Sequence, residues 1–500
     1  MNVPSFTVVK QYEPKVGEER LGSAIDLADQ ILKERPSLRL TSEFQALVPE
    51  RISPAPTLHL DDLSEIRRLK SLSNACYFQE RARLRASEDD MVAVCGPETA
   101  AYEDYCREQL GLGSVRWLHP KPRARLDQLA GACWEDDVVR TELICRVLSD
   151  ELVYLHPHMG CLPVWELASL LSHESGRSIQ VIAPPPQLTA WVNNKLEFAT
   201  IVQKLLGERY VPRTVSAGCY ATLADRVMEI TSSCKTIGIK VTNSAGGKGI
   251  AILDGASLHN QTLSGLRTHL QSELESFQWD GQSELIINCW ETAIACSPSA
   301  QLWIPPPQQG GPIIEGIFMQ AMSDRLTDFK GSEAAVLPEP QMQEIVDKSY
   351  LISLLFQRLG YMGRCSFDLL LVGDGLEDSR VEFIECNGRW GGTSAPMTLM
   401  NRLFDDWKEQ PYISRIVTVN HLSSVGFSEL KDSLTDILYS QSAKNGRVII
   451  ILPGRVAFCS EIELIILGST TIEAKEFLDG VILPRLHRLV DDYDLASGIH

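Results

Sequence analysis

The most informative segment of the chain is Val381-Glu-Phe-Ile-Glu-Cys-Asn-Gly-Arg389, where a strand-like run ends in polar residues. Side chains on a strand point alternately to its two faces. Alternation places Glu385, Asn387 and Arg389 on one face. The other face then carries Glu382, Ile384 and Cys386. The first face therefore predicts a cluster of polar groups at the end of a strand.

A second strand-like run, 366–372, precedes this segment, and the polar turn 373–379 joins the two into a predicted β-hairpin. If Val372 pairs with Val381, Asp368 lies directly opposite Glu385. Carboxylate and amide oxygens are the ligands that Mg²⁺ prefers. We therefore predict Asp368, Glu385 and Asn387 as metal ligands. A strand end whose polar residues only meet solvent is the alternative.

Upstream, the segment Val241-Thr-Asn-Ser-Ala-Gly-Gly-Lys-Gly-Ile250 places three glycines around Lys248 between two strand-like runs. Glycines allow backbone N–H groups to close over an anion, and the lysine adds positive charge. The segment is not a Walker A loop, because position 242 is Thr and Gly249 follows the lysine. From this spacing alone a flexible hairpin turn is the favoured interpretation, and an anion-binding loop is the other one.

The first 189 residues alternate between short apolar runs and helical patterns. Strand-like runs at 91–94 and 178–183 flank a crowded apolar helix pattern at 162–171. This order predicts an α/β region with a mostly parallel sheet.

Residues 190–405 contain a predicted strand pair across 301–321 and a long helix over 341–359. The remaining residues, 406–500, have two strand-like runs and one helical pattern, which predicts a small α+β unit. The whole chain is thus predicted to be an α/β and α+β multidomain protein.

Composition limits the function. The chain has 500 residues, and 47 Lys and Arg against 65 Asp and Glu give a net charge of −18. An acidic chain of this kind does not suit binding of nucleic acid, which requires a basic face on the protein.

The 13 cysteines contain no C-x-x-C pair, so neither a disulfide framework nor a zinc ribbon is predicted. There is no secretory signal pattern and no apolar run near the ~18 residues that span a membrane, so we predict no membrane partner and a cytoplasmic location.

Together, these segments resemble an ATP-grasp domain over residues from about 190 to 405. In that family's order, Lys195 resembles the lysine near the domain start, and Lys240 the strand lysine that contacts nucleotide phosphates. The segment Leu285-Ile-Ile-Asn-Cys-Trp-Glu291 resembles the hinge strand, whose backbone receives adenine and whose closing glutamate contacts ribose. The nucleotide-binding residues that the resemblance implies are Lys195, Lys240, Ser244, Gly246, Gly247, Lys248, Gly249, Asn288, Trp290 and Glu291.

The resemblance also implies catalytic roles. Asp368, Glu385 and Asn387 match the metal ligands of the family. Arg389 matches the arginine that stabilises the transferred phosphate, and Lys248 is the second implied catalytic residue. The implied cofactors are ATP and Mg²⁺, with two ions bound and Mn²⁺ able to substitute.

Within that superfamily, the chain is similar to the peptide ligases of pheganomycin biosynthesis and their relatives. The resemblance implies a pre-ATP-grasp α/β domain over 1–189, an ATP-grasp domain over 190–405 and a small α+β domain over 406–500. It also implies an ATP-dependent carboxylate–amine ligase that makes a peptide bond through an acyl phosphate, in the biosynthesis of a small peptide or amino-acid-derived metabolite. The implied partners are small carboxylate and amine substrates, and a homodimer is compatible with it. A catalytically silent ATP-binding scaffold or regulator, and a ligase that uses a thiol or another nucleophile, are the alternatives.

Overall fold

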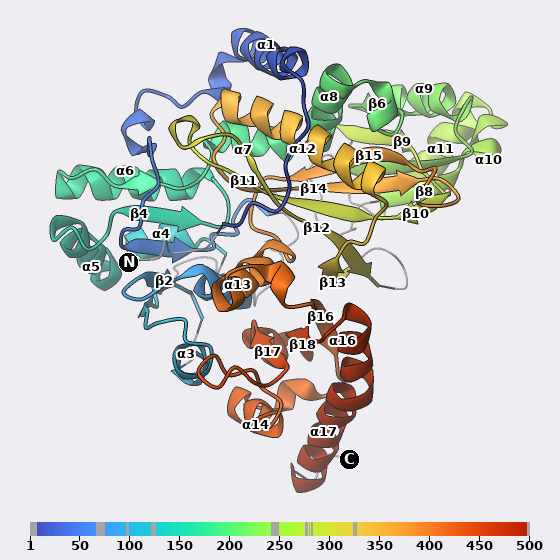
Figure 1. The fold of residues 1–500 in the computed structure, drawn as a ribbon. Coiled ribbons are helices and arrows are strands. Elements are labelled where there is room, and N and C mark those ends of the chain that lie inside the picture. The colour runs from blue at the N-terminus through green and yellow to red at the C-terminus, as the bar shows by residue number, and fades with distance from the viewer. Residues whose placement is uncertain are drawn as a thin grey trace.

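Three β-sheets organise the computed structural model of the chain. The structure describes residues 8–66, 76–96, 100–121, 127–241, 250–275, 279, 281, 284–323 and 328–497. Figure 1 shows a parallel sheet with its helices on the left, a small sheet with its helices at the upper right, and a large sheet between them that continues downward. The mixed α/β multidomain fold predicted from the sequence is confirmed.

The N-terminal sheet is parallel and has the strand order β3-β2-β1-β4-β5. Its strands are β1 (Thr57–Leu60), β2 (Met91–Ala93), β3 (Arg116–Leu118), β4 (Tyr154–Pro157) and β5 (Gln180–Val181). The helices of this region are α2 (Cys76–Gln79), α3 (Ala100–Asp104), α4 (Leu129–Glu135), α5 (Asp137–Leu148), α6 (Leu162–Ser175) and α7 (Pro186–Val192). Parallel strands read as continuous apolar runs because both faces are covered, which is why the sequence predicted this sheet.

The small sheet is antiparallel and has the order β6-β9-β7-β8. Its strands are β6 (Thr214–Ala217), β7 (Thr236–Val241), β8 (Ile250–Asp254) and β9 (Leu285–Cys289). One face packs against helices α9 (Tyr220–Thr231), α10 (Gly255–His259) and α11 (Leu263–Glu275). The opposite face carries Lys240 of β7, which is described with the candidate active site.

The large sheet runs in the order β10-β14-β11-β12-β13-β16-β18-β17, and β15 pairs with β14. Its strands are β10 (Ile294–Cys296), β11 (Pro298–Ile304), β12 (Ile313–Met322), β13 (Phe329–Ala334), β14 (Gly363–Val372), β15 (Arg380–Asn387), β16 (Tyr412–Thr418), β17 (Val448–Ile451) and β18 (Glu461–Leu467). Helices α8 (Lys195–Leu206) and α12 (Glu339–Leu359) cover one face, and α1 (Glu18–Glu34) lies beside α12 (Figure 1). Helix α13 (Ser394–Phe404) packs on the other face, against Phe318.

The strands of the last region do not form a sheet of their own. β16 pairs with β13 and β18 pairs with β16, so residues up to 467 extend the large sheet. The remaining helices are α14 (Phe427–Ser433), α15 (Gly454–Cys459), α16 (Thr471–Phe477) and α17 (Leu483–Ser497). Tyr102 and Tyr105 from the N-terminal region belong to the same apolar core as these elements. The predicted boundaries at 189/190 and 405/406 stay predictions.

The hairpin of β14 and β15 contains a β-bulge that the sequence prediction did not include. Asp368 pairs with Glu385, as predicted, but the register then shifts, and Val372 pairs with Arg380 instead of Val381. The extra residue in β15 is Ile384, so Phe383 and Cys386 both face the core. The predicted grouping of Glu382 and Ile384 with Cys386 on one face is therefore wrong, because a bulge inverts alternation beyond it.

One pair of cysteines is bonded in the small sheet region. Cys234, just after α9, and Cys289, at the end of β9, form a disulfide with their Cα atoms 5.4 Å apart. The other 11 cysteines are free. The disulfide joins two segments of the small sheet region rather than forming a framework across the chain.

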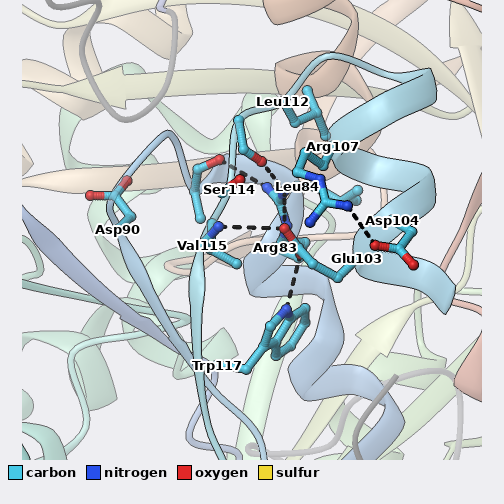
Figure 2. A network of polar contacts seen from close by, with 12 residues as sticks. Arg83, Leu84, Asp90, Glu103, Asp104, Arg107, Leu112, Ser114, Val115 and Trp117 are labelled. Carbon is cyan, nitrogen blue, oxygen red and sulfur yellow. Dashed lines mark hydrogen bonds and ion pairs between the residues drawn. The ribbon is translucent and has the colours of Figure 1, made fainter. Parts of the chain in front are cut away.

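A buried ion pair fixes a segment within the N-terminal region, and a hydrogen bond from α13 joins that segment to the large sheet region. Arg83, in the 3₁₀ helix η4 (Glu80–Arg85), donates to both carboxylate oxygens of Glu103 at 2.6 and 3.0 Å. Figure 2 shows the indole of Trp117 donating to the same carboxylate, at 2.9 Å. From the other side, Arg402 of α13 donates to the Leu84 carbonyl at 2.8 Å.

Within the described part of the chain, no helix is both long and apolar enough to cross a membrane.

Candidate active site

The three predicted metal ligands lie together at the end of the β14–β15 hairpin. Asp368 on β14 faces Glu385 on β15. Two residues beyond Glu385 on the same strand, Asn387 pairs with Ser366. The Asn387 side-chain amide donates to Asp368 Oδ2 at 3.0 Å. Their side chains point to the sheet face opposite the one that α8 and α12 cover.

Two polar residues that the sequence prediction did not single out hold Asp368 in place. Ser299 Oγ of β11 and Gln320 Nε2 of β12 donate to Asp368 Oδ1 at 2.8 and 2.7 Å. Burial, together with the nearby charge of Glu385, raises the pKa of Asp368 to about 7. Asp368 is thus a partly buried carboxylate whose oxygens are oriented by neighbouring strands.

Lys195 reaches the same group from the start of α8. The side chain of Asn194 caps that helix by accepting from the amides of Leu196 and Glu197, which fixes the first turn. From there Lys195 Nζ lies 2.7 Å from Glu385 Oε2. Burial would raise the pKa of Glu385, but Lys195 and two further cations outweigh it and lower the pKa to about 2.

Lys240 reaches the site from the small sheet. It lies on β7, is 8% exposed and places its Nζ 5.1 Å from the ring centre of Trp290. The pKa of Lys240 is lowered to about 8, chiefly by burial; Glu385 opposes this shift and Lys195 adds to it. Lys195, Lys240 and Glu385 come from three separate elements, and each acts electrostatically on the others.

Arg389 follows β15 and is positioned by a residue that the sequence prediction missed. Asn193 Oδ1 accepts from Arg389 Nη1 at 2.7 Å and from the Gly388 amide at 3.0 Å. Arg389 also contributes to the low pKa of Glu385. The sequence did place Asn193 beside Lys195 at the start of the region, but nothing in the local pattern connects it with residue 389, 196 positions away.

The predicted hinge residues lie next to these lysines. Asn288 is 7% exposed on β9, and Trp290 follows the strand. The amides of Cys289 and Trp290 already donate within the sheet region, to the carbonyls of Arg213 and Thr236. Glu291 accepts from Arg380 at 2.9 Å. The predicted adenine and ribose contacts of this segment stay predictions.

The predicted glycine-rich loop lies outside the described residues. This applies to Ser244, Gly246, Gly247, Lys248 and Gly249. The strands on either side, β7 and β8, pair as neighbours from Lys240 with Ile250 onward, so the loop connects two adjacent antiparallel strands.

The residues at the hairpin end suit a hard divalent cation. Asp368 and Glu385 are two carboxylates on directly opposed positions, and Asn387 adds an amide oxygen. The raised pKa of Asp368 reflects burial and the repulsion between these carboxylates. A cation between them would remove that repulsion, so the residues fit Mg²⁺.

His156 and His158 belong to a buried cluster that touches the Arg389 loop. Both side chains are buried, at 0% and 3% exposure. His156 Nε2 accepts from the Trp390 indole at 3.3 Å, and the His158 carbonyl accepts from the Trp390 amide at 3.0 Å. The carboxyl end of β4 therefore meets the residue that follows Arg389.

Gly238 provides a test of the nucleotide side of this site. A Cβ at Gly238 would lie 2.6 Å from Trp290 Cε3 and 3.0 Å from Asn288 Oδ1. Gly238→Ala should therefore displace Trp290 from beneath Lys240 and weaken binding of an ATP analogue roughly tenfold, in line with the usual cost of overpacking. Fluorescence titration with a labelled ATP analogue measures this.

Gly218→Ala is the matched control, because a Cβ there meets no atom within 4 Å. We expect this control to bind the analogue as the unmodified protein does. Equal affinity of the Gly238→Ala variant would show that Trp290 does not contribute to the nucleotide site.

No protein-family model matches the chain, and no curated protein matches it in sequence. Solved structures do match its fold. A structure of purK, N5-carboxyaminoimidazole ribonucleotide synthetase, with ADP has a TM-score of 0.52 at 11% identity, covering 88% of this chain and 98% of that chain. The biotin carboxylase domain of Hydrogenobacter thermophilus 2-oxoglutarate carboxylase, with MgADP, ADP and bicarbonate, has a TM-score of 0.50 at 12% identity, covering 89% and 95%.

A third match is N5-carboxyaminoimidazole synthetase from Staphylococcus aureus with ADP, which has a TM-score of 0.50 at 9% identity and covers 88% of this chain and 100% of that chain. Each of the three matches covers 88–89% of this chain. The fold of this chain is therefore the ATP-grasp fold.

Proposed function

We propose that the protein is an ATP- and Mg²⁺-dependent ligase that joins a carboxylate to an amine. The observation that carries the proposal is the meeting of Asp368, Glu385 and Asn387 with Lys195 and Lys240 at the junction of the two antiparallel sheets. Arg389 stands at the same strand end. Such a face combines cation ligands with positive side chains, which suits the terminal phosphates of a nucleotide.

The proposed reaction begins with transfer of the γ-phosphoryl group of ATP to the substrate carboxylate. A carboxylate is a poor acyl donor because its leaving group would be oxide, and phosphorylation replaces that group with phosphate. The amine then attacks the acyl carbon, the C–O bond to phosphate breaks, and the amine proton is lost. The products are an amide, ADP and orthophosphate. The protein contributes mainly positioning and charge neutralisation.

The residues of the site have distinct roles in this proposal. Mg²⁺ held by Asp368, Glu385 and Asn387 would neutralise charge on the β- and γ-phosphates. Arg389, fixed by Asn193, would bind the oxygens of the transferred group. Lys240, buried against Trp290, would bind the phosphates from the small-sheet side. The loop that contains Lys248 would cover them and exclude water.

The expected position of adenine depends on which backbone amides of the hinge are available for hydrogen bonds to it. The sheet already uses the amides of Cys289 and Trp290, so recognition of adenine would fall to the backbone after Trp290, around Glu291. Glu291 would then leave Arg380 to contact the ribose.

The peptide-ligase subtype rests on the resemblance to the pheganomycin-type ligases in domain order. The strand pair β11 and β12, which that resemblance includes, places Ser299 and Gln320 beside Asp368. A ligase that uses a thiol nucleophile would share the first step and differ only in the second. A catalytically silent ATP-binding protein would bind nucleotide and carry out neither step.

The products distinguish this chemistry from adenylation. Incubation with ATP, Mg²⁺ and a panel of amino acids and short peptides should release ADP and orthophosphate in equal amounts. With acid labelled by ¹⁸O in its carboxylate, mass spectrometry should find one label in the orthophosphate, because that oxygen bridges carbon and phosphorus in the acyl phosphate. Hydroxylamine should trap a hydroxamate when the amine is withheld.

Each alternative gives a different result. Label in AMP, with pyrophosphate as the second product, would contradict transfer of the terminal phosphate. A protein that binds the ATP analogue but releases no ADP with any member of the panel would support the silent scaffold. A thioester as the only product mass would indicate a thiol nucleophile.

A further inference from the structure

Arg81 lies where three parts of the molecule meet. It belongs to η4, beside the carboxyl end of the N-terminal parallel sheet. Its Nη2 donates to His158 Nδ1, after β4, at 3.1 Å, and its Nε lies 3.6 Å from Asp61 Oδ2, after β1. Its charge also lowers the pKa of Glu463 on β18, although burial raises that pKa overall. In parallel sheets, ligands bind outside the carboxyl ends of the strands where the strand order reverses, here between β1 and β4.

Arg81 is close to Arg389. The His158 carbonyl accepts from the amide of Trp390, the residue after Arg389. Burial lowers the pKa of His158 well below its usual value, and both Arg81 and Arg389 lower it further. One guanidinium group therefore contacts the His158 imidazole from the N-terminal sheet, and the other acts on it electrostatically from the strand end that carries the predicted metal ligands.

Arg81 shares its carboxylate with Arg85. Asp61 Oδ1 lies 2.6 Å from Arg85 Nη2, and Asp61 Oδ2 lies 3.6 Å from Arg81 Nε. Glu463 is paired with Arg455. The Arg81 side chain is only 10% exposed, and its Nε makes no hydrogen bond with any residue that the structure describes. Two buried guanidinium groups on one carboxylate leave an excess of positive charge, which an anion would neutralise.

Arg81 is also held in place rather than free to turn toward solvent. The Arg83–Glu103 ion pair fixes the middle of η4 (Figure 2), and Arg402 holds the Leu84 carbonyl. Such a fixed, buried donor is pre-organised for a ligand, because little side-chain entropy is lost on binding.

We propose that Arg81 binds a second anionic group of the acid substrate, so that the substrate class is acids with two anionic groups. One carboxylate would lie beside Arg389 and be phosphorylated, and the other group, a carboxylate or a phosphate, would pair with Arg81. The inference rests on the proposed function, from which it takes the position of the reacting carboxylate.

A binding experiment tests the inference without requiring turnover. Calorimetric titration of the full chain, in saturating ADP and Mg²⁺, uses unbranched dicarboxylates from malonate to adipate, and acetate as the single-anion probe. We expect one chain length to bind best, because the two guanidinium groups are a fixed distance apart. Arg81→Met should weaken that compound about thirtyfold, as removal of one partner of a buried charge pair does, and leave acetate binding unchanged.

The ω-phosphonocarboxylates of the same lengths form the second arm. Tighter binding of a phosphonate than of the matched dicarboxylate would assign a phosphate group to Arg81, and the reverse order would assign a carboxylate. Arg358→Met is the matched control, because Arg358 is an exposed arginine on α12 whose partner is Asp29. Its affinities should equal those of the unmodified protein.

Three results would overturn the inference: no binding of any member of either series by the unmodified protein, equal affinities in the Arg81→Met variant, or equal weakening of acetate. If Arg81→Met does not fold, Arg81→Lys keeps the charge but removes the Nε donor, and it should weaken the best compound by a smaller factor. Failure of the proposed function appears separately, as absence of ADP release with any acid.

Discussion

Replacement of Glu385 by glutamine is expected to reduce the rate of ADP release by roughly a thousandfold or more. The carboxylate faces Asp368 across the hairpin and pairs with Lys195 at 2.7 Å, so under the proposed function it would serve both the metal and a phosphate-binding lysine. Glutamine keeps the shape of the side chain but lacks the charge. Steady-state kinetics across a range of Mg²⁺ concentrations measure the effect, which excess Mg²⁺ should restore only in small part.

Loss of this carboxylate also affects stability. The folded-state pKa of Glu385 is lower than its unfolded value, so its charge stabilises the fold above the unfolded pKa, neutral pH included, and this contribution is lost as the pH falls through the folded pKa. Glu333→Gln is the matched control. Burial raises the pKa of Glu333, but Lys475 and Arg415 outweigh it on the far face of β13. We expect both variants to melt at a lower temperature and only Glu385→Gln to lose activity. Near-normal turnover in that variant would remove Glu385 from the site.

Replacement of Arg389 by methionine is the second large effect. We expect kcat to fall about 10³-fold, the usual scale for removal of an arginine that stabilises a transferred phosphoryl group. The affinity for an ATP analogue should change little, because Lys195, Lys240 and the hinge region are intact. Single-turnover measurement of ADP formation separates the chemical step from product release.

Two further variants make the Arg389 result specific. Asn193→Ala removes the acceptor that orients the guanidinium and should produce a smaller loss of kcat with the same pattern. Arg358→Met, at the surface ion pair with Asp29, should leave kcat unchanged. A loss of ATP-analogue affinity equal to the loss of kcat would show that Arg389 binds the ground state and has no special role in transfer.

The sequence predicted the opposition of Asp368 and Glu385 correctly from an incorrect starting pair. Pairing was counted from Val372 and Val381, whereas the structure shifts by one residue at the bulge. The shift has a sequence signal, since the core-facing apolar residues change from odd positions at Val381 and Phe383 to an even position at Cys386. Nothing in the alternation alone shows at which residue the extra position falls.

Other parts of the site depend on contacts that no local pattern reveals. Ser299 and Gln301 alternate with apolar residues on β11, so a polar face was visible, but its partner Asp368 lies 69 positions away from Ser299. Arg81 lay in a segment to which the sequence gave no role. Its position beside His158 arises only when the N-terminal sheet packs against the loop after β15.

The continuation of the large sheet into β16 has a consequence for how the protein is made. A ribosome produces the chain from its N-terminus, and β13, which ends at Ala334, must wait for β16, which begins at Tyr412, before its outer backbone groups are paired. An uncovered strand edge is a template for pairing with other chains. The nascent core is therefore exposed to aggregation until late in translation, and a chain cut short before β16 would be a substrate for chaperones rather than a smaller folded protein.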